Sequence, residues 1–318
     1  MTPEEIRLKQ NPVLTGLLKA MSQGRYIATR VLPSFSQKLS SQLFGELGDE
    51  AMRRYNLVRA PGTNTKRVTI NIKGKVYTIK QKSVEIPIAR ELLREADEMR
   101  ALNVGAYPEV SQMAMSTISD ILALDYELDA AELLSNTTSY PAGNVISLTG
   151  TALWSGDNSK PIDDIRDARE IIRKAAGVRP NMLTLGAAVY ERLCRHPQII
   201  AGLGANAVKI VTDDFLKQIL GVAEIVVGDT VWVNEKNVTA DVWGDMALLS
   251  YSPAVTPSTA SAIDAPFGIT SVMEGHPFSE KPYWEDQTKS WIFGGTYERL
   301  PNLLKPAAGV LFDKPLGT

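Results

Sequence analysis

The stretch EVSQMAMSTISDILALDYELDAAELLSN, residues 109–136, predicts one long amphipathic helix. Apolar and small residues recur along it at alternating spacings of four and three, which places them on one continuous stripe. The stripe consists of Val110, Ala114, Thr117, Ile121, Leu124, Leu128 and Ala131. At about 1.5 Å per residue, such a helix is about 40 Å long. We expect Ile121 and Leu128 to be buried, and Asp125 and Glu132 to lie towards the polar side.

The helix belongs to an acidic block, residues 91–136, in which ten acids face only Arg94 and Arg100, a net charge of −8. The acids are Glu91, Glu95, Asp97, Glu98, Glu109, Asp120, Asp125, Glu127, Asp129 and Glu132. A basic block of charge +9 and without acids precedes it. Its members are Arg53, Arg54, Arg59, Lys66, Arg67, Lys73, Lys75, Lys80 and Lys82. Such charge runs are either solvated faces or surfaces that meet, within one chain or between chains.

Residues 67–80 within the basic block predict a β-hairpin. Val68, Ile70 and Ile72 alternate with polar residues, Lys73-Gly74 supplies a two-residue turn, and the chain returns to Ile79. One face of this hairpin is apolar. Because a lone two-stranded hairpin is only marginally stable in water, we expect it to lie on another surface.

The N-terminal region predicts a short helix over residues 1–23, with Thr2 as its cap and an interruption at Asn11-Pro12. Residues 24–56 have a mixed, extended pattern that is typical of an arm lying on a partner. Such arms fray unless something holds them.

The remainder alternates helices and strands, which predicts an α+β fold without internal repeats. A helix runs from Ser159-Lys-Pro161 to Ala176 and ends at Gly177, and Thr212 caps another helix that ends near Gly221. Strands are expected at 182–185, 223–227, 231–233, 241–250, 268–274 and 290–297, and residues 302–312 close the chain.

Composition excludes several classes of protein. Cys194 is the one cysteine, so no internal disulfide forms, and His196 and His276 are the only histidines. We interpret His196, just before Pro197, as a partner of a helix C-terminus. Nucleotide-binding, hydrolase and zinc-protease motifs are missing, so we predict no enzyme, no cofactor and no metal site. We find no membrane-spanning stretch, and the acidic N-terminus lacks the pattern of a secretory signal, which predicts a cytoplasmic protein.

Two ordered sets of residues resemble the major capsid proteins of tailed bacteriophages, the Hong Kong 97-type family. The first is Tyr26-Ile-Ala-Thr-Arg-Val-Leu-Pro33 followed by Arg59-Ala-Pro-Gly-Thr63. The second runs through Gly150-Thr-Ala-Leu-Trp154, Ser159-Lys-Pro-Ile162, Pro180-Asn-Met-Leu-Thr-Leu-Gly186, Val189 and His196-Pro197. Together they cover roughly residues 25 to 200.

The resemblance implies a Hong Kong 97-like fold built from an N-terminal arm, an extended β-hairpin loop, a peripheral domain with a long spine helix, and an axial domain. These map onto residues 1–50 for the arm, 51–90 for the loop, 91–145 and 251–300 for the peripheral domain with its spine helix at 109–136, and 146–250 and 301–318 for the axial domain.

The resemblance also implies a function, that of a major capsid protein assembling through hexamers and pentamers into an icosahedral shell around double-stranded DNA. In this family the extended loop lies over a neighbouring subunit. Candidate inter-subunit contacts are therefore the nine basic residues of the 53–82 block together with Asp120, Asp125, Glu127, Asp129 and Glu132.

Expected partners are other copies of the chain, a portal, an optional decoration protein, and packaged DNA on the inner face without sequence specificity; no membrane is involved. Few residues precede the arm, so a separate scaffolding protein is expected. The location is the virion, after assembly in the host bacterial cytoplasm.

Two other functions fit the same residues. The basic 53–82 segment is compatible with a nucleic-acid-binding module, whose DNA affinity would fall steeply with salt. Another head or tail structural protein of a phage would be distinguished by assembly into rings or tubes.

Overall fold

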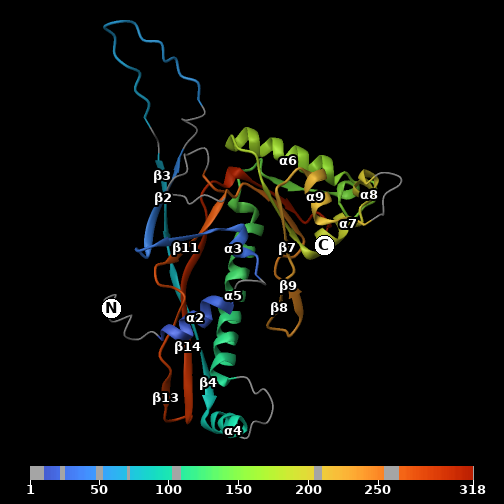
Figure 1. Ribbon diagram of the computed structural model, residues 1–318. Coiled ribbons are helices and arrows are strands. Elements are labelled where there is room, and N and C mark those ends of the chain that lie inside the picture. The colour runs from blue at the N-terminus through green and yellow to red at the C-terminus, as the bar shows by residue number, and fades with distance from the viewer. Residues whose placement is uncertain are drawn as a thin grey trace.

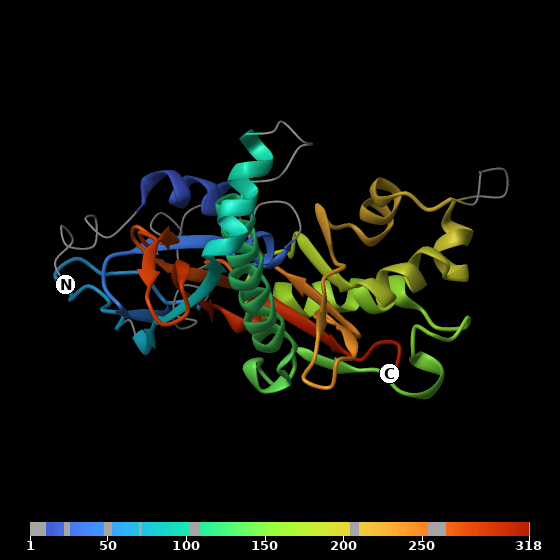
Figure 2. The same cartoon turned by 90° about the horizontal axis from the view of Figure 1, so that it is seen from below.

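The computed structural model describes residues 11–21, 26–47, 53–69, 72–101, 109–203, 210–253 and 265–317. Helices and strands are mixed, as the sequence predicts, and the long helix α5, Val110–Ser135, runs through the middle of the molecule (Figure 1). Seen from below, the N-terminal elements and one sheet lie on one side of α5, and helices α6 to α9 lie on the other (Figure 2). The molecule therefore has two parts joined along one helix.

A six-stranded sheet forms the first part, and its centre is the long strand β14, Ser290–Leu303. Strand β14 pairs antiparallel with four other strands: β4 (Lys80–Ala89), β11 (Gly268–Met273), β12 (Phe278–Ser279) and β13 (Tyr283–Glu285). Strand β1, Ser34–Gln37, adds to β11 in parallel. The strands predicted at 268–274 and 290–297 are confirmed as β11 and β14. Strand β14 extends beyond the predicted end, and β11 pairs antiparallel with this extension, residues 299–303.

Helix α5 covers this sheet together with α2, Pro12–Met21. Met115, Ile118 and Leu122 pack with Phe293 of β14 and Leu18 of α2 in one apolar cluster. The short helix α4, Arg90–Ala101, follows β4 directly at the far end of the sheet (Figure 1).

The predicted phase of the long helix is wrong although its span is right. The side chain of Ile121 is 43% exposed and that of Leu128 is only partly buried. The buried residues of α5 are Ala114, Met115, Ile118, Ser119, Leu122, Ala123, Tyr126, Glu127, Ala130, Ala131 and Leu134. Apolar residues surround much of the helix, so the spacing was compatible with two stripes, and contact with the sheet selects the one through Ile118 and Leu122.

The second part is built on a five-stranded sheet in the order β5-β15-β10-β6-β7. The strands are β5 (Val145–Ser147), β6 (Met182–Gly186), β7 (Glu224–Gly228), β10 (Met246–Ser250) and β15 (Gly309–Asp313). Helices α6 (Pro161–Ala176), α7 (Ala187–Cys194), α8 (Pro197–Gly202) and α9 (Asp213–Leu220) complete it. Gly177 has a φ of 73°, and the Thr212 side chain accepts the N–H of Phe215, so both predicted helix boundaries are confirmed.

The predicted hairpin about Lys73-Gly74 is wrong. Strand β3, Ile72–Thr78, passes straight through these residues and pairs antiparallel with β2, Ser41–Leu47, so that Gly74 lies opposite Gly45. The ribbon thus closes over a much longer excursion than a two-residue turn, and Ile79 follows it as a buried residue.

Asn11-Pro12 begins helix α2, and the part of the predicted helix that precedes Asn11 lies outside the described residues. The Asn11 side-chain oxygen accepts the N–H groups of Val13 and Leu14, and Pro12 occupies the first turn of α2. The predicted cap at Thr2 lies outside the described residues. Downstream, α3, Ala28–Val31, buries Ala28, Val31 and Leu32 against the main core. A separate two-stranded ribbon, β8 (Val231–Val233) with β9 (Thr239–Asp241), projects from the second part (Figure 1).

Candidate assembly interface

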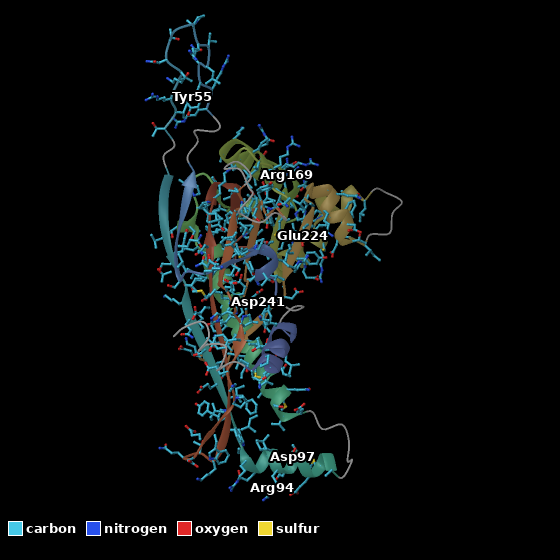
Figure 3. All side chains as sticks on the ribbon, turned by 60° about the vertical axis from the view of Figure 1, so that its left-hand side comes forward. Tyr55, Arg94, Asp97, Arg169, Glu224 and Asp241 are labelled. Atoms are coloured by element: carbon cyan, nitrogen blue, oxygen red, sulfur yellow. The ribbon has the colours of Figure 1, made fainter. Side chains whose placement is uncertain are left out.

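Residues 53–69, named here the loop segment, form the far end of the extended excursion between β2 and β3. Every residue of the loop segment except Tyr55 is exposed. Figure 3 shows Tyr55 on this excursion, well away from the sheets. Arg53, Arg54, Arg59, Lys66 and Arg67 all belong to the loop segment, which contains no acidic residue. Five of the nine basic candidates are therefore displayed together on one extended surface.

The remaining basic candidates lie on strands. Lys73 and Lys75 belong to β3, paired in register with Glu46 and Phe44 of β2, and their side chains lie outside the described residues. Lys80 and Lys82 begin β4, where Lys80 is exposed and Lys82 is partly buried.

Lys82 joins the basic block to the acidic block within one chain. Its Nζ lies 2.6 Å from Asp125 Oδ2 and 2.5 Å from Asp129 Oδ2. Burial lowers the pKa of Lys82, but hydrogen bonds to the two carboxylates raise it by more, so the net shift is upward. Asp125 and Asp129 are thus already engaged by their own subunit, and only Asp120 and Glu132 among the five acidic candidates are exposed.

Glu127 is not available to a neighbouring chain, because its side chain is completely buried. The carboxylate accepts the backbone N–H groups of Ile27 and Ala28 at 3.0 and 2.9 Å and the Trp243 indole N–H at 2.7 Å. Burial raises the pKa of Glu127, and these three donors partly offset that rise. Its inclusion among the inter-subunit candidates is therefore corrected: Glu127 holds α3 and the loop before β10 to the long helix.

Arg299 is a partly buried cation that the sequence gave no reason to single out. Its guanidinium carbon lies 4.1 Å from the ring centre of Tyr126 and 3.8 Å from that of Tyr297. The guanidinium also donates to the Leu122 carbonyl oxygen. Burial lowers the pKa of Arg299. This packing ties β14 to α5 next to the Lys82 cluster, and it depends on residues far apart in the sequence.

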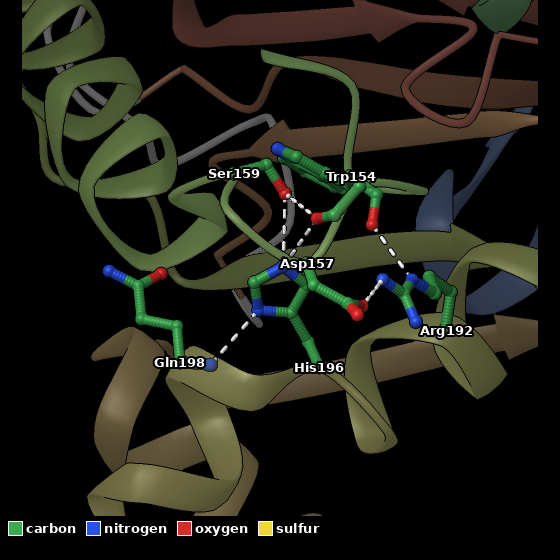
Figure 4. Close-up of polar contacts among 7 residues, drawn as sticks. Trp154, Asp157, Ser159, Arg192, His196 and Gln198 are labelled. Atoms are coloured by element: carbon green, nitrogen blue, oxygen red, sulfur yellow. Dashed lines mark hydrogen bonds and ion pairs between the residues drawn. The ribbon is translucent and has the colours of Figure 1, made fainter. Parts of the chain in front are cut away.

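Trp154, Ser159 and His196, three residues of the resemblance, meet in one buried cluster (Figure 4). Trp154 donates to Asp164 at 2.8 Å, and Arg192 donates to the Trp154 carbonyl oxygen at 2.9 Å and to Asp157 at 2.7 Å. These contacts fix the connection between β5 and α6 against α7, which is a structural task.

The Ser159–His196 pair is not arranged for nucleophilic catalysis. His196 Nδ1 accepts the N–H of Gln198 at 3.2 Å, so the ring proton of the neutral imidazole is on Nε2. That atom lies 2.9 Å from Ser159 Oγ, and Ser159 donates its own proton to the Gly156 carbonyl oxygen at 2.7 Å. Nε2 therefore cannot take the serine proton as a general base must. Burial lowers the pKa of His196. His196 caps the start of α8, which corrects its interpretation as a helix C-terminal partner.

Gly186, which ends the Pro180–Gly186 motif, is required by close backbone packing. A Cβ at this position would lie 1.9 Å from the Gly244 carbonyl oxygen. Strand β6 therefore passes into α7 directly beneath the turn that leads into β10.

Within the described ranges, no helix is long and apolar enough to cross a membrane. The same residues contain no group of three or more His, Cys, Asp or Glu side chains that could hold a metal ion.

Comparison with known proteins supports one family. Residues 139–296 match the family described as phage major capsid protein E. The chain is 30% identical over 244 residues to the major capsid protein of Burkholderia phage BcepMu, and the match covers 76% of each chain.

Solved structures agree. A phage-related protein from Bordetella bronchiseptica RB50 is 31% identical, with a TM-score of 0.78 over 97% of this chain and 98% of that one. The capsid of Cyanophage P-SCSP1u shares the fold at 14% identity, with a TM-score of 0.55 over 89% of this chain and 86% of that one. The chain therefore belongs to the family of phage major capsid proteins, has the Hong Kong 97-type fold, and is a structural protein rather than an enzyme.

Proposed function

We propose that the chain assembles with copies of itself, through hexamers and pentamers, into an icosahedral shell around a double-stranded DNA genome. The observation that carries this proposal is the loop segment, which is extended, exposed and basic although it belongs to a well-packed subunit. A solitary protein gains little from ordering such a loop. A neighbouring subunit that covers the loop compensates for the conformational entropy lost.

The subunit divides in this proposal as the resemblance implies: arm 1–50, extended loop 51–90, peripheral domain 91–145 with 251–300, and axial domain 146–250 with 301–318. Two sheets with separate apolar clusters support the division, as does the position of α5 between them. Strand β4, at the end of the extended loop, belongs to the six-stranded sheet and anchors the loop there.

The loop segment crosses onto the long helix of the next subunit in this arrangement. Asp120 and Glu132 are the exposed acids of that helix among the proposed contacts, whereas Asp125 and Asp129 already bind Lys82. Individual exposed ion pairs contribute only about 0.2–1 kcal/mol, but a closed shell repeats each of them many times.

Further partners belong to the same proposal: a separate scaffolding protein, a portal, an optional decoration protein, and packaged DNA on the inner face. Assembly takes place in the host bacterial cytoplasm, and the mature location is the virion.

Negative-stain microscopy and sedimentation of the expressed protein, alone and with its scaffolding protein, test the proposal. We expect rings or closed shells. A folded protein that stays monomeric at high concentration with scaffold present would contradict it, and tubes would favour a tail protein.

Charge reversal separates the loop contact from a general effect of charge. Arg59, Lys66 and Arg67 changed together to Glu should abolish shells while the subunit still folds. The matched control reverses three exposed basic residues of the second part, Lys160, Lys174 and Arg179, with the same change in net charge. Equal assembly of the two variants would show that the loop takes no part in the contact between subunits.

The exposed basic loop also favours a second candidate function, binding of nucleic acid by residues 53–82. That function predicts a log–log salt dependence of DNA affinity with a slope of about −0.9 per phosphate neutralised. Loss of this slope in the loop variant, with assembly intact, would favour this second candidate.

A further inference from the structure

The ribbon formed by β8 and β9 has an open edge whose polarity follows from its register. Thr230 accepts the N–H of Val242 at 2.9 Å, and Val238 accepts the N–H of Asn234 at 3.0 Å. Hydrogen-bonded and non-hydrogen-bonded pairs alternate in an antiparallel ladder. The pairs Val231–Asp241 and Val233–Thr239, which lie next to these hydrogen-bonded positions, are therefore non-hydrogen-bonded pairs. The N–H and C=O groups of Val231 and Val233 therefore point away from β9.

The outer edge of β8 combines these backbone groups with exposed apolar side chains. Val231 is 43% and Val233 is 60% exposed, and both are β-branched. The opposite edge carries Asp241, a charge of the kind that discourages strand addition. Among the described residues, β8 pairs with no strand other than β9. An edge of this type is a template for a further strand.

The subunit's own loop segment does not lie on this edge. Figure 3 shows Tyr55 at the end of the extended excursion, far from Asp241 of β9. A covering strand from the loop segment must therefore come from a second copy of the chain.

A second copy could offer either its own β8 or its loop segment, and charge separates the two. Antiparallel pairing of β8 with β8 that aligns Val231 with Val233 places Asp229 opposite Glu235, and like charges directly opposite are destabilising. The ribbon, residues 229–241, has three acids and one base. Residues 53–59, Arg-Arg-Tyr-Asn-Leu-Val-Arg, have three arginines, no acid and no proline, and Leu57 and Val58 are 74% and 90% exposed.

We infer that residues 53–59 of one subunit add as a strand to the outer edge of β8 in another. The contact is heterologous, since it joins two different surfaces, and contacts of this type close into rings when the rotation between neighbouring subunits closes. The inference rests on the assembly proposed above and names for it a second surface, the outer edge of β8, in addition to the long helix.

A pair of proline substitutions on the same rung of the ribbon tests the contact. Val233→Pro removes an N–H that points to the outer edge of β8, and Thr239→Pro removes its counterpart on the outer edge of β9. Neither substitution removes a hydrogen bond between β8 and β9, so the ribbon should remain formed in both variants. We expect Val233→Pro to lower the sedimenting fraction at least tenfold and Thr239→Pro to leave it within twofold of wild type.

Equal behaviour of the two proline variants, whether both assemble or both fail, would overturn the inference. If wild type and both variants assemble, the inference is rejected but the proposed shell function is not. Failure of wild type to assemble would reject the shell function itself, and the inference with it.

Cysteine cross-linking identifies the occupant directly. In a Cys194→Ser background, Val233→Cys combined with Leu57→Cys or Val58→Cys should give a ladder of disulfide-linked oligomers within assembled particles. Dimers formed by Val233→Cys alone would indicate pairing of β8 with β8. That result, or particles without any cross-link in both combinations, would overturn the inference.

Discussion

The carboxylate of Glu127 accepts the indole N–H of Trp243 at 2.7 Å, which joins the long helix to the loop that leads into β10. The same carboxylate binds the first amide groups of α3. One buried side chain of the spine therefore connects the arm, the spine and the second part of the subunit.

Replacing Glu127 by Gln should destabilise the subunit. The carboxylate accepts through both oxygens, whereas an amide has one accepting oxygen and one donating NH2 group. At least one buried N–H therefore faces another donor in the variant, at a cost of about 1–3 kcal/mol. The free energy of unfolding, measured with urea on unassembled subunits, reports this loss.

Glu132→Gln is the matched control, because Glu132 is exposed on the same helix. Its unfolding free energy should stay within about 0.5 kcal/mol of wild type. Equal stability of the two variants would mean that the carboxylate network contributes nothing.

The phase of α5 can be tested with neighbouring residues. Leu122→Ala should cost about 2–5 kcal/mol, since Leu122 is 6% exposed in a packed cluster. Ile121→Ala removes a similar volume from a side chain that is 43% exposed and should cost far less. Soluble yield and urea unfolding measure both, and a larger loss for Ile121→Ala would reverse the phase.

Elements whose signals are local were predictable from the sequence. Gly177 ends one helix and Thr212 begins another, and both caps were predictable because a left-handed cap and an N-cap need only nearby residues. The hairpin prediction failed because the partner of β3 is β2, some thirty residues earlier, and a periodic apolar pattern does not reveal which strand pairs with which. Ile70 and Val68 fitted a local turn that competes with this distant pairing.

From the sequence, the candidate interface could be predicted only as two blocks of opposite charge. The opposite blocks do meet within the chain at Lys82, one of the two alternatives that the sequence left open. The burial of Glu127 and the packing of Arg299 against Tyr126 and the Leu122 carbonyl arise from contacts across 99 to 177 residues. Composition and spacing contain no signal for such contacts.

The Lys82 cluster should contribute modestly to stability. A double-mutant cycle with Lys82→Met and Asp129→Asn should give a coupling energy of about 0.2–1 kcal/mol, because both side chains remain more than 30% exposed. The coupling should weaken as salt is raised. A coupling above about 3 kcal/mol that does not change with salt would contradict this expectation.

Acid should destabilise the subunit through His196. Burial lowers the pKa of His196 below its usual 6.5, so between the folded pKa and 6.5 the unfolded chain binds a proton that the folded chain does not. The stability due to the neutral imidazole is complete above pH 6.5 and is lost as the pH falls. His276 has a pKa lowered by burial as well and acts in the same direction.

His196→Asn isolates this effect, because Asn caps a helix as well as His but does not titrate. Unfolding free energies from pH 8 to pH 5 should show a smaller decline for the variant, by up to about 1.4 kcal/mol per pH unit. Parallel pH profiles of wild type and variant would show that His196 takes no part.

The register of β4 with β14 determines how the subunit bears tension. Ten consecutive pairs, from Ala89 with Ser290 to Lys80 with Arg299, join the two strands, and β4 is the strand that leads out of the extended loop. A pull on the loop acts along β4 and perpendicular to its hydrogen bonds, so the bonds are loaded in shear and share the force instead of opening one at a time. The pairing of β4 with β14 therefore anchors the loop against mechanical force. Internal pressure on a shell can then be transmitted from one subunit to the next without unfolding the subunits.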